Sequence, residues 1–122
     1  MHSNSEHLSK MKEEQQVKTF IGTFDELKEL IQESRKLFVV DFFATWVLPS
    51  KKLLPHLSEI AKEHPDVEVI RIDIDKNLEI SDHYQIVSVP HVKFFKSVSN
   101  NDFIEYGFDN GCKPEIIRSK ID

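Results

Sequence analysis

The run from Leu37 to Phe43 limits the fold of this chain more than any other segment. Every residue in the run is apolar except Asp41. An unbroken apolar run of this length, rich in valine and phenylalanine, is typical of a strand that is covered on both faces. Helices must then lie on both sides of the sheet, so the run predicts an α/β fold.

Patterns elsewhere in the chain extend this prediction. Thr23 and Glu26 have the spacing of a capping box, which indicates that a helix begins there. Pro49 suits the first turn of a second helix, and Pro55 inside that helix is expected to bend it. Strands are expected at 17–21, 67–74, 91–96 and 103–106, a polar turn at 97–102, and further helices at 78–84 and 114–121. The order β-α-β-α-β-α-β-β-α predicts a mixed central β-sheet flanked by helices on both faces.

Length and charge exclude several classes of protein. The 122 residues are enough for one domain with a core. A formal charge of -5, with no basic stripe to offset it, argues against a nucleic-acid partner. Residues 1–16 are polar and charged, which predicts a flexible N-terminal tail before a domain at 17–122. No segment resembles a signal peptide or a membrane span, so no membrane partner and a location in the cytoplasm or nucleus are expected.

The number and spacing of the cysteines and histidines limit the disulfide and metal chemistry that the chain can support. Cys112 is the one cysteine, so no intrachain disulfide can form, which fits a reducing compartment. The six histidines are scattered and show no metal-ligand spacing, so neither a metal nor a cofactor is expected. The charged residues Lys51, Lys52, Asp73 and Asp75 are predicted to lie on solvated faces.

Several short motifs occur in the same order as in one known family. They are Val40-Asp41-Phe42-Phe43-Ala44-Thr45-Trp46, Pro49, Pro55, Asp73-Ile74-Asp75-Lys76-Asn77, Val89-Pro90, Lys93-Phe94-Phe95-Lys96 and Gly107. Over residues 17–122 the chain resembles the thioredoxin family. The resemblance implies the thioredoxin fold and a cis peptide bond between Val89 and Pro90.

The redox turn is where the chain departs from that family. Thioredoxins carry Trp-Cys-Gly-Pro-Cys where this chain has Trp46-Val47-Leu48-Pro49-Ser50. Disulfide exchange needs a thiolate that attacks and a second thiol that resolves, and valine and serine supply neither. We therefore expect no catalytic residue at the former redox positions and no enzymatic activity, the ancestral activity being protein-disulfide reductase. A laboratory cysteine-to-serine change would explain Ser50, but it would explain Val47 and Leu48 poorly.

The resemblance also implies a former catalytic role for the position of Asp41. In thioredoxins an aspartate at this position is buried and assists proton transfer with the resolving cysteine. Arg71 aligns with a family lysine that lies near this aspartate. We therefore expect Asp41 to be a relic that either contacts Arg71 or stays protonated, because a buried carboxylate is costly when it is charged and unpaired.

The main functional hypothesis is a redox-inactive thioredoxin-like protein that binds a peptide or protein segment, as a chaperone-like protein or adaptor. A cis Pro90 exposes the backbone of Val89 at the rim of the former active-site groove, where an extended peptide can pair with it. Replacing Cys-Gly by Val-Leu also makes the surrounding patch more apolar. The predicted peptide-binding groove consists of Trp46, Val47, Leu48, Pro49, Val89, Pro90, His91 and Phe108.

Two alternatives stay open. The first is a thioredoxin-type disulfide oxidoreductase, either as an inactivated variant or with residual thiol chemistry through Cys112, which lies near the start of the last helix, where the helix dipole favours a thiolate. The second is a structural or oligomerisation subunit that uses the same apolar patch. A monomer or a weak homodimer is expected, and the identity of the protein partner is not readable from the sequence.

Overall fold

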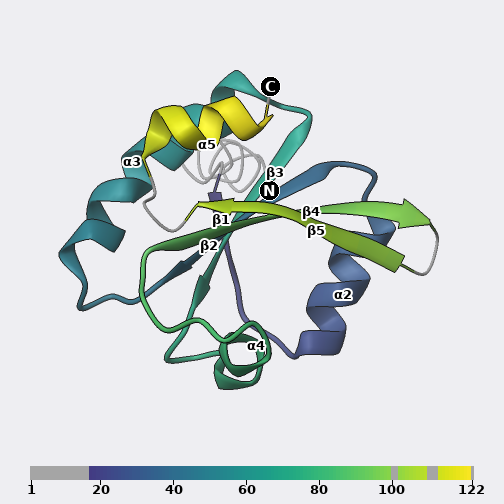
Figure 1. Ribbon diagram of the computed structural model, residues 1–122, viewed down its shortest axis with the longest axis horizontal. Coiled ribbons are helices and arrows are strands. Elements are labelled where there is room, and N and C mark those ends of the chain that lie inside the picture. The colour runs from purple at the N-terminus through teal and green to yellow at the C-terminus, as the bar shows by residue number, and fades with distance from the viewer. Residues whose placement is uncertain (1–16, 100–101, 110–112, 122) are drawn as a thin grey trace, which may run out of the picture.

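The computed structural model describes residues 17–99, 102–109 and 113–121, so the predicted tail at 1–16 and Cys112 lie outside the described residues. Within these ranges the elements follow the predicted order (Figure 1). They are β1 (Val17–Phe20), α2 (Phe24–Glu33), β2 (Leu37–Phe43), α3 (Leu48–Glu63), β3 (Val67–Asp73), α4 (Leu78–His83), β4 (His91–Ser99), β5 (Asp102–Asp109) and α5 (Pro114–Ile121).

The described strands form one mixed sheet, as predicted. Its five strands lie in the order β1-β3-β2-β4-β5. β1, β3 and β2 run parallel, whereas β4 is antiparallel to β2 and β5 is antiparallel to β4. The apolar run Leu37–Phe43 is thus β2, the middle strand of the sheet, and six of its seven residues are buried.

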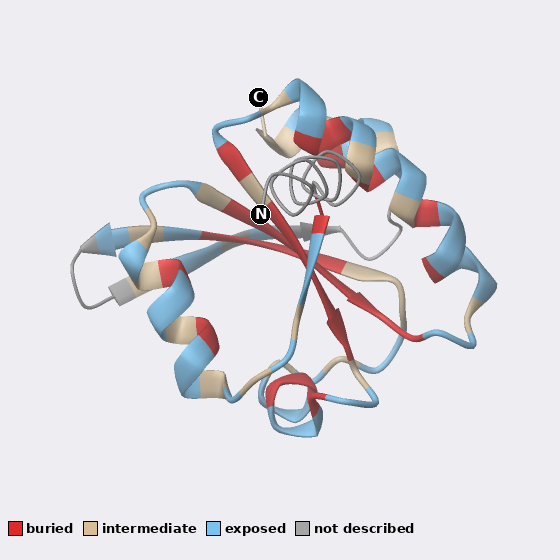
Figure 2. Cartoon of the chain, turned by 180° about the vertical axis from the view of Figure 1, so that it is seen from behind, coloured by how far each residue is buried: buried red, intermediate tan, exposed pale blue. Residues whose placement is uncertain are grey.

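Helices cover both faces of this sheet. α3 and α5 lie on one face, while α2 and α4 lie on the other (Figure 1). Alternate residues of β2 serve the two cores, because Val39 packs with Leu57 and Ile60 of α3 and Phe38 packs with Leu27 of α2. Figure 2 shows the buried residues gathered in the central strands and on the inner sides of the helices.

The capping box at the start of α2 is confirmed. The Thr23 hydroxyl accepts a 3.1 Å hydrogen bond from the backbone N–H of Glu26, and the Glu26 carboxylate accepts one of 2.8 Å from the N–H of Thr23. These two bonds satisfy donors that the first helical turn leaves open. The helix then buries Leu27 and Ile31 completely against the sheet.

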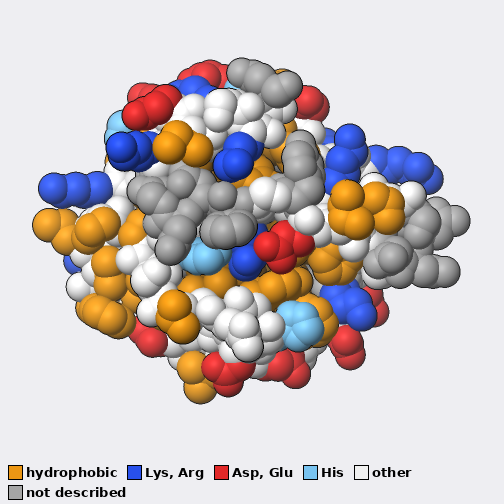
Figure 3. All heavy atoms as spheres, viewed as in Figure 1, with side chains coloured by type: hydrophobic (Ala, Val, Ile, Leu, Met, Phe, Trp, Pro, Cys, Tyr) orange, Lys and Arg blue, Asp and Glu red, His pale blue; other side chains and the backbone are white. Residues whose placement is uncertain are grey.

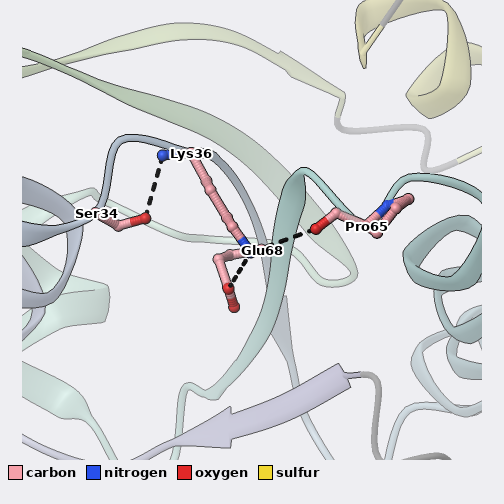
Figure 4. A network of polar contacts seen from close by, with 4 residues as sticks. All are labelled: Ser34, Lys36, Pro65 and Glu68. Atoms are coloured by element: carbon pink, nitrogen blue, oxygen red, sulfur yellow. Dashed lines mark hydrogen bonds and ion pairs between the residues drawn. The ribbon is translucent and has the colours of Figure 1, made fainter.

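The connections at the opposite end of the sheet are tied together by Lys36. Its ammonium group donates to the carbonyl of Pro65 and to the carboxylate of Glu68, each at 3.3 Å (Figure 4). Its backbone N–H donates to the Ser34 hydroxyl at 3.1 Å. These bonds join the α2–β2 connection to the segment that enters β3. Because the Lys36–Glu68 pair is partly exposed, its contribution to stability is below about 1 kcal/mol.

The β4–β5 hairpin is longer than predicted. β4 continues past Lys96 to Ser99 and β5 continues to Asp109, whereas the sequence pattern predicts strands that end at 96 and 106. The reason is that Ser97 and Phe103 still pair across the hairpin, since ladder pairing uses backbone groups and tolerates polar side chains at an edge. Gly107 therefore lies inside β5, with a φ of +80°, instead of in a loop. The expected bend at Pro55 stays a prediction.

Candidate functional site

Three connections meet at the carboxyl ends of β2 and β3. They are the β2–α3 turn at 44–47, the β3–α4 turn at 74–77 and the α4–β4 connection at 84–90. The backbone N–H of Ile74 donates to the carbonyl of Phe43 at 3.0 Å, which joins the first two connections. Phe42 is paired with His91, the first residue of β4, which brings the third connection alongside them. Parallel strands in α/β folds commonly place binding sites at this edge.

The β2–α3 turn is built to begin a helix. Val47 caps α3 with an extended backbone, its N–H donates to the carbonyl of Ala44 at 3.2 Å, and its own carbonyl accepts from the N–H of Ser50 at 3.1 Å. Pro49 lies in the first helical turn, where its missing N–H removes no helical bond. Ser50 is fully buried in the same turn, and its hydroxyl has no hydrogen-bond partner among the described residues.

Apolar side chains are exposed around this turn. Trp46 is 71% exposed and Leu48 is 59% exposed. Val47 is half-buried, and so are Val89 and Pro90 on the neighbouring connection. The placement of these residues at one edge of the sheet agrees with the predicted groove, although peptide binding there stays a prediction.

The α4–β4 connection brings the backbone of Val89 to the same edge. The Val89–Pro90 peptide bond is cis. The Val89 side chain packs against the core on the α2 side of the sheet, so the residue is anchored. Yet within the described part of the chain no hydrogen bond is made by the backbone N–H or C=O of Val89. His91 lies half-buried at the start of β4, with its ring edge-on to Phe42 at 6.3 Å between centroids.

The structure places Phe108 in β5, where it is paired with Lys93 of β4. Its side chain is outside what the structure describes, so its predicted part in the groove stays a prediction.

A charged cluster lies beneath the turn. Asp41 is fully buried, and its carboxylate accepts a 2.8 Å hydrogen bond from the Arg71 Nε, which confirms the predicted contact. The Arg71 Nη2 donates to the backbone carbonyl of Ser50 at 3.0 Å. Burial raises the pKa of Asp41 to about 6, and the attraction of the neighbouring Arg71 opposes that rise.

The sequence predicted that Asp73 and Asp75 lie on solvated faces, which is wrong for Asp73 and incomplete for Asp75. Asp73 is buried instead of solvated, and its carboxylate accepts a 2.9 Å bond from the backbone N–H of Asp75. Asp75 is exposed, but its carboxylate accepts a 2.9 Å hydrogen bond from the indole Nε1 of Trp46. No sequence spacing signals this second bond, because it joins residues 29 positions apart on different connections.

The side chains at the turn limit its own covalent chemistry. Val47 and Ser50 carry no sulfur, so these two positions cannot form a disulfide. The Ser50 hydroxyl also lacks a base among the described residues that would activate it as a nucleophile. Asp41 is the group beneath the turn whose pKa lies near neutrality, and it bonds to Arg71.

A mixed sheet of this strand order, with a helix that begins at the carboxyl end of its middle strand, defines the thioredoxin class of fold. The sequence profile of the family described as Thioredoxin matches residues 11–115. The chain therefore belongs to the thioredoxin family, which confirms the resemblance and the fold expected from the sequence.

Individual relatives support the same assignment. The thioredoxin of Geodia cydonium is 35% identical over 86 residues, which are 70% of this chain and 81% of the relative. Thioredoxin-1 of Caenorhabditis elegans is 31% identical over 106 residues, which are 87% of this chain and 86% of the relative. The solved structure of Trichomonas vaginalis thioredoxin has a TM-score of 0.82 and 34% identity, covering 87% of this chain and 95% of that one.

These relatives correct one prediction. Replacement of both redox cysteines predicted a protein that is not an enzyme. Relatives between 31% and 41% identical are named thioredoxins, which are oxidoreductase enzymes. The family is thus an enzymatic one, and the prediction of a non-enzyme is wrong on this comparison. It relied on two positions alone, whereas the likeness to the enzymes extends over most of the chain.

No helix in the described ranges is long and apolar enough to cross a membrane.

Proposed function

We propose that this thioredoxin-family protein binds an extended segment of a protein partner across the edge formed by Trp46, Val47, Val89 and Pro90. The observation that carries the proposal is the backbone of Val89. Its N–H and C=O make no hydrogen bond with the rest of the described chain, and its side chain is anchored in the core. Backbone groups held in place without partners can pair with an added strand.

The apolar surroundings support the same binding mode. Trp46 is largely exposed, yet its indole is held by the bond to Asp75, so a large flat surface is presented with little freedom to lose. Aromatic side chains with restricted motion are favoured contact residues, because less conformational entropy is lost on binding. A bound segment would gain affinity from backbone pairing at Val89 and from apolar contact with Trp46.

A peptide experiment tests this proposal. Binders selected from a displayed library of random peptides are labelled, and their affinities are measured by fluorescence anisotropy. We expect Trp46→Ala to weaken binding about tenfold or more, whereas Val98→Ala, at an exposed apolar residue on the β4–β5 hairpin, leaves it unchanged.

Backbone pairing has its own readout in the same assay. Methylating one peptide N–H at a time should abolish binding at the position that pairs with Val89 and leave its sequence neighbours less affected, since hydrogen-bonding groups alternate along a strand. Equal affinity for the unmodified chain and for Trp46→Ala would contradict the proposal.

Thiol–disulfide exchange is a second candidate function, favoured by the names of the relatives. In such exchange a thiolate attacks one sulfur of a client disulfide, forms a mixed disulfide and releases the other sulfur as a thiolate, after which a second thiol frees the client. Here Cys112 would supply the attacking thiolate and a free thiol reductant would supply the second.

Turnover of an insulin disulfide with dithiothreitol as the reductant tests this candidate. We expect a rate above the dithiothreitol background that disappears in Cys112→Ser. A rate equal to background in the unmodified chain would exclude exchange through Cys112, without bearing on peptide binding at Val89.

A further inference from the structure

An apolar pocket lies beside the turn that begins α3. Its volume is about 280 Å³, and it lies between the first turns of α3 and the start of α5. Its lining residues are Leu48, Pro49, Lys52, Leu53, His56 and Pro114. Leu48 and Pro49 also belong to the predicted groove, so the pocket adjoins the surface described above.

One wall of the pocket is formed by a residue that departs from the family pattern. Leu48 occupies the position where the family pattern of the redox turn has glycine. A glycine has no side chain and could not form this wall. Leu48 is 59% exposed, so a group that fills the pocket would also remove part of an exposed leucine from water.

One residue that lines the pocket, Lys52, is positively charged, in a protein whose net charge is -5. Lys51 and Lys52 are exposed, and neither forms an ion pair with the other described residues. The first turn of α3 contains no acidic residue, so the positive end of the helix dipole is not neutralised there. An acidic group next to an apolar group would therefore match Lys52 and the apolar lining together.

We propose that this pocket is a second subsite for the same bound segment. It takes one large apolar side chain, and an aspartate or glutamate beside that side chain pairs with Lys52. The inference rests on the proposed function, and it adds the chemistry of the partner: an extended acidic segment with an apolar anchor. Lys52 both lines the pocket and carries the charge, so it positions the acidic residue relative to the anchor.

Two synthetic peptides test the inference. Both carry the same selected groove-binding segment followed by an acidic extension, and the extension contains a leucine in one peptide and an alanine in the other. We expect the leucine peptide to bind the unmodified chain about tenfold more tightly, as burial of one apolar side chain predicts. Leu48→Gly should abolish this difference, and Leu48→Ala, which keeps better helix propensity, should reduce it.

Charge variants supply the second arm. Lys52→Gln should weaken binding of the leucine peptide and flatten its dependence on salt, because a screened ion pair is lost. Lys62→Gln, an exposed lysine in the last turn of α3, is the matched control and should change neither quantity.

The outcomes separate the two proposals. If both peptides bind with equal affinity and Trp46→Ala weakens both, the groove stands and the pocket is overturned as a subsite. If neither peptide binds the unmodified chain, the proposed function fails and the subsite fails with it. Concentration-dependent dimerisation that Leu48→Gly abolishes, measured by sedimentation, would assign the pocket to a second copy of this chain and overturn the inference.

Discussion

Arg71 and Asp41 are direct neighbours across the two central strands, and their side chains meet in the interior. The two residues are paired in the β2–β3 register, and the Arg71 Nε lies 2.8 Å from the Asp41 carboxylate. The guanidinium carbon also lies 3.9 Å from the centre of the Phe43 ring. Because the same guanidinium bonds to the carbonyl of Ser50, it joins the sheet to the first turn of α3. One side chain therefore supports the turn from below.

Removing this arginine should destabilise the protein strongly. Arg71→Met leaves the buried Asp41 carboxylate without its partner, and we expect the free energy of unfolding to fall by about 3 kcal/mol at neutral pH. Urea unfolding measures the change. Lys36→Met, which breaks the partly exposed pair with Glu68, is the control and should cost below about 1 kcal/mol. Similar losses in both variants would show that burial does not increase the contribution of the Asp41–Arg71 pair to stability.

Protonation of Asp41 should make the stability of the protein depend on pH. Burial raises the pKa of Asp41 from 3.8 to about 6 in the folded protein. Between these values the folded state keeps a proton that the unfolded state has lost, so this group's contribution to stability is greatest below pH 3.8. It falls as the pH rises to about 6 and is constant above that, with a total change of about 3 kcal/mol.

Asp41→Asn isolates this contribution, because the asparagine does not titrate. The free energy of unfolding is measured at several pH values for both proteins, and the difference between them removes the other carboxylates. We expect the unmodified chain to lose stability relative to Asp41→Asn as the pH rises from 4 to 6, the window of the raised pKa. A relative gain over that window would mean that Arg71 lowers the pKa of Asp41 further than burial raises it.

The bond between Trp46 and Asp75 should control the motion of the indole ring. Trp46 is the one tryptophan of the chain, so tryptophan fluorescence reports the motion of this ring alone. Asp75→Ala removes the acceptor, and we expect faster local rotation of the ring, seen as a lower anisotropy, with a stability change below about 1 kcal/mol because the site is exposed. Asp66→Ala, at another exposed aspartate, is the control. An unchanged anisotropy in Asp75→Ala would show that packing holds the ring.

The fold could be predicted because its signals are local and agree with one another. The apolar run of β2 indicated two covered faces, and the Thr23 capping box placed the start of α2. The hairpin was predicted less well, because the segment 97–102 is mostly polar, and pairing along β4 and β5 depends on the partner strand. The local amino-acid composition of one strand does not show where its partner strand ends.

The candidate site was predicted in outline for a different reason. Family resemblance placed the turn at Trp46 and the connection at Val89 on one edge of the sheet. The charge–charge contact of Asp41 with Arg71 followed from alignment, but the bonds from Arg71 to Ser50 and from Trp46 to Asp75 did not. The pocket beside Leu48 could not be predicted from the sequence either, since its lining comes from α3 and from Pro114, about 60 residues further along the chain. Contacts of that kind arise only once the helices pack.

On the face of the molecule that Figure 3 shows, blue cations are scattered among orange apolar side chains and do not form one large charged area. The chain's net charge of -5 thus says little about local recognition. Lys52 is an example, because it lines an apolar pocket in an acidic protein.

Restoring sulfur to the turn should restore efficient exchange there, provided that the scaffold is intact. Val47 caps α3 and Ser50 lies three residues further on, so the double variant Val47→Cys with Ser50→Cys places one thiol at the positive end of the helix and a second thiol one turn below it. The helix dipole favours the thiolate at position 47, and the buried position 50 supplies the resolving thiol.

We expect the double variant to reduce insulin at least about tenfold faster than the unmodified chain, with the single variant Val47→Cys trapped as a mixed disulfide because it lacks the resolving thiol. Mass spectrometry detects the trapped species, and Cys112→Ser in the same background keeps the remaining cysteine from contributing. A double variant that folds but turns over no faster would show that the turn has lost more than its sulfur, and that Leu48 or the Arg71 contact now prevents the geometry that exchange requires.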